Sequence, residues 1–141
     1  MTLTERYPLG RAYLLGVGSL LLVQGAAGLI VRASGHDPHA ATRLLSDPMH
    51  STVHLVWGVV MLLAAARRDP RVESGVLLAF GLFYVGFLVL GLLVHHPLGM
   101  QIDGKENAFH AVIGPLALLI WARERRRRPS RLPSPDLEEA R

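Results

Sequence analysis

The apolar residues of this chain fall into four blocks: residues 13–31, 49–66, 75–94 and 108–122. The first and third blocks contain no charged residue and lack the polar stripe of a helix on the surface of a soluble protein. A helix that crosses the hydrocarbon core of a bilayer, about 30 Å thick, needs about 20 mostly apolar residues. The second and fourth blocks reach this length when their polar first turns are included. The pattern therefore predicts an all-α integral membrane four-helix bundle. Its helices are expected at about residues 13–31, 48–66, 75–95 and 104–124.

Capping residues and prolines support these helix boundaries. Asp47 is a favourable N-cap, and Pro48 suits the first position of the second helix. Asp103 and Glu106 have the spacing of a capping box at the start of the fourth helix. Pro115 removes one backbone hydrogen bond within that helix, so we expect a kink there that neighbouring helices stabilise.

The polar segments divide the chain into a membrane domain and two tails. We expect residues 1–12 to form a cytoplasmic N-terminus and residues 13–124 to form the membrane domain. Residues 67–74 are interpreted as a short loop, and residues 125–141 as a basic, disordered tail. The arginines of this tail would attract anionic lipid head groups.

The charged residues predict the orientation of the bundle. The net charge of +4 arises from arginines gathered on one side of the predicted membrane, so it is not taken as a sign of nucleic-acid binding. Lys and Arg are enriched in cytoplasmic loops, which places both termini in the cytoplasm and Tyr13 and Trp121 near the inner membrane boundary. The arginines on this side are Arg6, Arg11, Arg67, Arg68, Arg71, Arg123, Arg125, Arg126, Arg127, Arg128, Arg131 and Arg141. The opposite side has Arg32, Arg43 and Lys105.

The second and fourth helices share a polar pattern at a constant offset of 56 residues, since Asp47, Ser51, His54, Gly58 and Arg67 match Asp103, Asn107, His110, Gly114 and Arg123. The first and third helices match less strongly. The pattern predicts two pseudo-repeated helical hairpins, related by a pseudo-twofold axis along the membrane normal. Gly58 and Gly114 are expected to allow close packing between helices.

All seven histidines lie at the end of the bundle opposite most of the arginines. His54 and His110 are each about two turns into their helices, with polar residues one turn earlier on the same face. Because polar side chains avoid lipid, this face is expected to point into the bundle. The candidate polar network comprises His50, Ser51, His54, Glu106, Asn107 and His110.

These residues allow three interpretations. A purely structural His/Asn network would hold the hairpins together, with no cofactor. Alternatively, His50, His54, Glu106 and His110 could ligate a transition metal, or paired histidines of the second and fourth helices could hold haem b. A third hypothesis is a response to external pH, because histidines titrate near neutrality. The other histidines, His36, His39, His95 and His96, are expected to be solvated.

The chemistry of an enzyme is not evident. The chain has no cysteine, which excludes disulfides, thiolate ligands and a thiol nucleophile. It also lacks an arrangement of nucleophile, base and orienting group, and a glycine-rich phosphate loop. We therefore do not expect catalysis.

Two segments, residues 49–58 and 106–114, resemble the bacterial membrane family catalogued as domain of unknown function 4383. Its pattern is similar to His50, His54 and Gly58 in the first segment, and to Asn107, His110 and Gly114 in the second. The similarity covers about residues 14–123. Ser51 replaces an asparagine of the family pattern, Glu106 replaces an aspartate, and Pro115 follows the second glycine.

The resemblance implies a four-helix membrane protein but no activity. We therefore expect a small structural or accessory protein of the bacterial cytoplasmic (inner) membrane. It is expected to cross the membrane several times and to have an outward-facing His/Asn polar network. The lipid bilayer is its expected partner, together with a homo-oligomer or a larger membrane complex.

Overall fold

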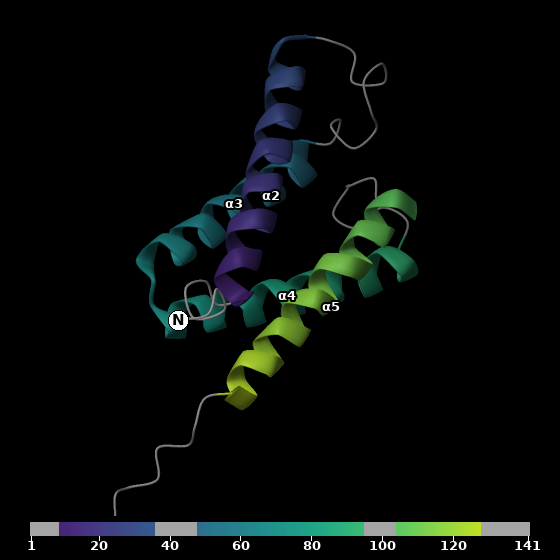
Figure 1. The fold of residues 1–141 in the computed structure, drawn as a ribbon. Helices are drawn as coiled ribbons and strands as arrows, with labels where there is room; N and C mark the ends of the chain where they lie inside the picture. The colour runs from purple at the N-terminus through teal and green to yellow at the C-terminus, as the bar shows by residue number, and fades with distance from the viewer. Residues whose placement is uncertain (1–8, 36–47, 95–103, 128–141) are drawn as a thin grey trace, which may run out of the picture.

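The computed structural model describes residues 9–35, 48–94 and 104–127, and within these ranges the chain is almost entirely α-helical. Four helices follow one another, and the described residues contain no strand (Figure 1). The all-α prediction is therefore confirmed. The helices are α2 (Leu9–Ala33), α3 (Pro48–Arg67), α4 (Pro70–Leu93) and α5 (Gly104–Arg127).

Three of the described helices, α2, α3 and α4, are long and apolar enough to cross a membrane. Helix α5 is of similar length, with 24 residues, but it does not reach the same apolar level. Its first turn is polar, and charged residues begin at Arg123, which confines the apolar part to residues 108–122. A membrane crossing by α5 stays a prediction.

The helices pair as two hairpins, because α2 packs mainly against α3 and α4 packs mainly against α5 (Figure 1). Glycines lie where the helix backbones come closest. A Cβ atom on Gly58 would lie 2.6 Å from the backbone nitrogen of Leu22, and one on Gly114 would lie 3.0 Å from that of Val85. Small residues permit this approach, so Gly58 and Gly114 occupy the packing positions expected of them.

Helix α4 begins five residues earlier than the apolar pattern predicts. The side chain of Asp69 accepts a hydrogen bond of 2.8 Å from the backbone N–H of Arg71, and Pro70 occupies the first turn. Arg68 has a positive φ of 53° in the short turn from α3. Residues 70–74 are therefore helical rather than a loop. Hydrophobicity misses this turn because its residues are polar, although Glu73 is buried.

The interior of the bundle is apolar, and so is much of its outer surface. Leu14, Leu21, Met61, Leu77 and Phe80 are fully buried. Large aliphatic side chains, among them Val23, Ile30, Leu92, Leu93 and Leu119, are exposed on the outside. Such a surface is unusual for a monomer in water and is typical of helices surrounded by lipid.

Several predicted features can be compared directly with the structure. Helix α3 begins at Pro48, as predicted, and α5 continues through Pro115. Tyr13 is buried inside the bundle, and its expected position near the inner membrane boundary stays a prediction. Trp121 is half-buried, with the guanidinium carbon of Arg125 5.3 Å from its ring centre. The proposed caps Asp47 and Asp103 lie outside the described residues.

Candidate metal centre

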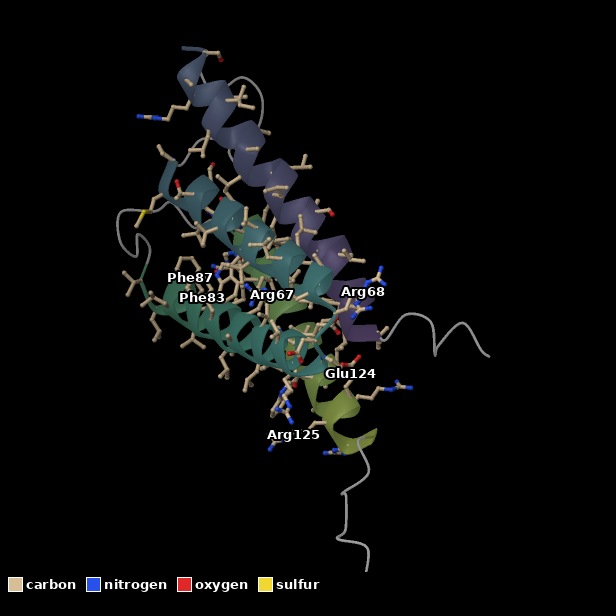
Figure 2. All side chains as sticks on the ribbon, turned by 90° about the vertical axis from the view of Figure 1, so that its left-hand side faces the viewer. Arg67, Arg68, Phe83, Phe87, Glu124 and Arg125 are labelled. Carbon is tan, nitrogen blue, oxygen red and sulfur yellow. The ribbon has the colours of Figure 1, made fainter. Side chains whose placement is uncertain are left out.

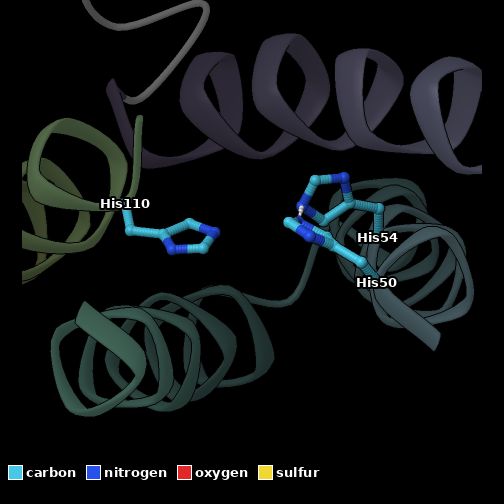
Figure 3. A group of neighbouring side chains, drawn as sticks. All are labelled: His50, His54 and His110. Atoms are coloured by element: carbon cyan, nitrogen blue, oxygen red, sulfur yellow. Dashed lines mark hydrogen bonds between the residues drawn. The ribbon is translucent and has the colours of Figure 1, made fainter. Parts of the chain in front are cut away.

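Three histidines meet inside the bundle. His50 and His54 lie one turn apart on α3, and their side chains share a face because residues four apart are neighbours on a helix. His110 approaches from α5, so the cluster joins the two hairpins (Figure 3). The three residues are only 4%, 2% and 1% exposed, respectively. One ring nitrogen from each lies within 4.8 Å of the others.

The Nε2 atoms of His50 and His54 are almost as far apart as two ligand atoms of one metal ion. Their Nε2 atoms are 2.9 Å apart, a distance at which one ring nitrogen donates a hydrogen bond to the other (Figure 3). Two imidazole nitrogens at zinc-bond lengths of about 2.0–2.1 Å in a tetrahedron are roughly 3.3 Å apart. A small adjustment of the two rings would therefore let both nitrogens face one metal ion.

Glu106 contacts the other nitrogen of His50. Its Oε1 atom is 3.4 Å from His50 Nδ1, and both side chains are buried. A carboxylate in this position fixes the orientation and tautomer of a histidine whose second nitrogen can bind a metal. The structure thus brings together His50, His54, Glu106 and His110, the four predicted ligand residues. The geometry favours Glu106 as a positioning residue rather than a direct ligand.

Aromatic side chains enclose the histidines. The ring centres of Tyr84 and Phe87 are 5.1 Å and 5.5 Å from that of His110, and the ring centre of Phe109 is 6.2 Å from that of His54. Phe83 stacks on Phe87 at 5.5 Å (Figure 2). This wall shields the cluster from its surroundings and lowers the local dielectric constant.

Tyr84 is a neighbour of the site that the sequence analysis missed. Tyr84 has the only side chain with a hydrogen-bonding group within residues 75–94. A single hydroxyl in an otherwise apolar helix was the feature of the sequence that could have indicated a place at the site. Its ring centre lies 6.4 Å from that of His54, so it contacts histidines of both hairpins.

The polar groups around the cluster do not all satisfy one another. His110 Nδ1, Tyr84 Oη and Asn107 Oδ1 are buried and have no hydrogen-bond partner among the residues that the structure describes. A buried polar group without a partner costs about 1–3 kcal/mol. Ser51 is also buried, and its backbone oxygen lies close to Gly25 of α2. The polar contacts observed within the predicted network join His50 to His54 and to Glu106. A network that also includes Ser51, Asn107 and His110 stays a prediction.

A second polar cluster lies at the opposite end of the bundle. The guanidinium group of Arg11 pairs with Glu73, and its Nε atom is 2.7 Å from Oε1. The N–H of Gly10 donates to Glu124 at 2.6 Å. Figure 2 shows Arg68, Glu124 and Arg125 at this end, away from Phe83 and Phe87. The sequence analysis used these arginines for orientation only and missed the contacts between helices.

A third contact joins α2 to α5 nearer the middle of the bundle. The hydroxyl group of Tyr13 donates a hydrogen bond of 2.6 Å to the backbone oxygen of Ile113. The remaining histidines, His36, His39, His95 and His96, lie outside the described residues, so their predicted solvation stays a prediction.

These features define a class of protein: a helical bundle with membrane-type helices and a buried histidine cluster. The chain belongs to the family described as Domain of unknown function (DUF4383), whose model matches residues 11–122. This match confirms the resemblance and includes all three histidines of the cluster. No curated protein and no solved structure matches the chain.

Proposed function

We propose that this chain is an integral membrane protein that binds one transition-metal ion through His50, His54 and His110. The observation that carries this proposal is the convergence of three buried imidazoles from two separate hairpins. Imidazole nitrogen is a ligand for zinc, copper, iron and nickel. Glu106 would hold His50 in place from outside the coordination sphere.

The apolar surroundings support a bound ion over an empty cluster. Burying polar groups costs free energy unless they are satisfied, and the aromatic side chains packed on the cluster offer few hydrogen-bonding partners. A metal ion would bind nitrogen lone pairs that have few alternative partners in this aromatic setting. Metal binding would also stabilise the fold, because the site forms only when both hairpins are packed.

The same geometry favours an ion over haem. A porphyrin between histidines of α3 and α5 would need a flat slot beside the rings. Tyr84 packs against both His54 and His110, and Phe109 packs against both from the adjoining position. These side chains occupy the space that a macrocycle would require.

We further propose that α5 crosses the membrane and that both termini face the bacterial cytoplasm. The described arginines Arg11, Arg67, Arg71 and Arg123 belong to the helix ends opposite the histidine cluster, which supports this orientation through the positive-inside rule. The metal centre would then lie near the outer face. A C-terminal reporter that is active only outside the cytoplasm would contradict this arrangement.

The proposed duplication of a two-helix unit also gains support. His50 and Glu106, which are 56 residues apart and correspond in the repeat, contact each other. Gly58 and Gly114, another corresponding pair, occupy similar close approaches in their own hairpins. A centre on the pseudo-twofold axis would draw ligands from both halves.

A structural role without a metal is the second candidate function. It is favoured by the contact between His50 and Glu106, which joins α3 to α5. In that case the protein would be a small accessory component of a membrane assembly, and substitutions in the cluster would alter folding without changing any bound ligand.

Metal titration of purified protein distinguishes the two candidates. The protein would be stripped with a chelator in mild detergent and dialysed against zinc or, without oxygen, against cuprous ion. We expect one tightly bound ion per chain, and none in the His54→Ala/His110→Ala variant. The matched control is Arg11→Met/Glu73→Met, which removes the polar pair at the opposite end and should keep the ion. Wild-type protein that binds neither metal would refute the proposal.

A further inference from the structure

We infer that the histidine centre selects monovalent copper over zinc. This inference rests on the proposed function and adds the identity and charge of the ion. It follows from the number of donors, the charge around them and the closure of the site.

The donor set suits a three-coordinate ion. His50, His54 and His110 supply three nitrogens, and no other His, Cys, Asp or Glu among the described residues joins this group. Glu106 faces the far nitrogen of His50. Zinc in proteins is almost always four-coordinate, and with three protein ligands it takes a water or substrate as the fourth. A cuprous ion has a filled d shell and accepts three nitrogen ligands in a plane.

The charge balance points in the same direction. Among the described acidic residues, Glu106 is the one that contacts a histidine of the cluster. Three neutral imidazoles, one carboxylate and one cuprous ion sum to zero. Zinc with the same groups leaves one positive charge, and an uncompensated charge in an apolar interior is strongly disfavoured. Zinc would need a bound hydroxide to restore neutrality.

The walls of the site oppose that additional ligand. Tyr84, Phe87 and Phe109 pack directly on the histidine rings, and His54 and His110 are almost completely inaccessible. Cupric ion is also disfavoured, because it prefers tetragonal coordination with more ligands than this cluster provides. The same enclosure would therefore hold copper in its reduced state.

The test is a competition between the two metals on the intact protein in mild detergent. Zinc-loaded protein would be mixed without oxygen with cuprous ion buffered by bicinchoninate, and both metals would be measured after gel filtration. We expect copper to replace zinc completely. X-ray absorption should show a three-coordinate cuprous ion with only nitrogen or oxygen neighbours at bonding distance.

Two variants test the reason for the selectivity. Glu106→Gln keeps the size of the side chain but removes its charge, so the cuprous complex gains a net positive charge. We expect a loss of about 10–100-fold in copper affinity, the range observed for outer partners of metal ligands. Glu124→Gln makes the same change on the same helix, but at the opposite end of the bundle, where Glu124 contacts Gly10. This control should bind copper as the wild type does.

The outcomes separate this inference from the proposed function. Zinc that resists displacement, or a four-coordinate metal in the absorption spectrum, would overturn the choice of copper and leave a metal-binding protein. Failure to bind either ion would overturn both. Because competition and spectroscopy use the wild-type chain, the test does not depend on the folding of any variant.

Discussion

The histidine cluster is buried, and the polar contacts at the arginine-rich end of the bundle are partly buried. The two regions differ in how their polar groups are satisfied. Glu73 pairs with Arg11, and the N–H of Gly10 pairs with Glu124. At the other end, His110 Nδ1 and Tyr84 Oη have no hydrogen-bond partner within the described part of the chain. Polar groups that satisfy one another hold the helices together without a ligand. Polar groups without partners can still bind a ligand such as a metal ion.

The largest expected effect on stability comes from breaking the ion pair at the arginine-rich end. Glu73→Gln should lower the free energy of unfolding by about 3–5 kcal/mol, because Arg11 would be left partly buried without its counterion. Unfolding in mixed micelles with increasing denaturing detergent would measure it. Arg11→Met/Glu73→Met should recover much of the loss. A single variant as stable as the wild type would show that the pair adds little.

An intermediate effect on stability is expected from binding a metal ion at the histidine cluster. At a metal concentration about 100 times the dissociation constant, binding to the native state alone adds about 2.7 kcal/mol of stability. The same unfolding titration should show this gain in the wild type and in Glu73→Gln, but not in His110→Ala. An equal gain in His110→Ala would place the ion elsewhere on the protein.

The smallest effects are expected from two tyrosines, because one hydroxyl makes a hydrogen bond and the other makes none among the described residues. Tyr13→Phe removes a made hydrogen bond to Ile113 and should cost about 1 kcal/mol. Tyr84→Phe removes an unpaired hydroxyl and should be neutral or stabilise the metal-free protein by up to about 1 kcal/mol. Paired unfolding curves in the absence of metal would test this. A larger loss for Tyr84→Phe would mean that its hydroxyl is satisfied in solution.

Features that depend on neighbouring residues in the sequence could be predicted more easily than features that depend on contacts between distant residues. The start of α3 at Pro48 could be predicted because proline favours the first turn of any helix. The start of α4 at Pro70 was placed too late, although Asp69-Pro70 is an equally local signal, because the polar residues after it were taken for a loop. The hydrogen bond from Tyr13 to Ile113 could not be predicted, because the two residues lie 100 positions apart in the sequence.

For the candidate site, helical periodicity sufficed to place His50 and His54 on one face, and the repeat suggested His110 as their counterpart. The positioning role that we propose for Glu106 could not be assigned in this way. A ligand and an outer positioning group have the same spacing along a helix, and only the contact with His50 Nδ1 separates them.

The sequence by itself determined the helical class, the four helices, the family and the separation of histidines from arginines. Each depends on composition or on spacing within one helix, where geometry repeats every 3.6 residues. Only the tertiary structure decided which groups meet across the hairpins: Arg11 with Glu73, Tyr13 with Ile113, and Tyr84 with His54 and His110. These contacts depend on how helices cross and rotate against each other, which no periodicity along one helix specifies.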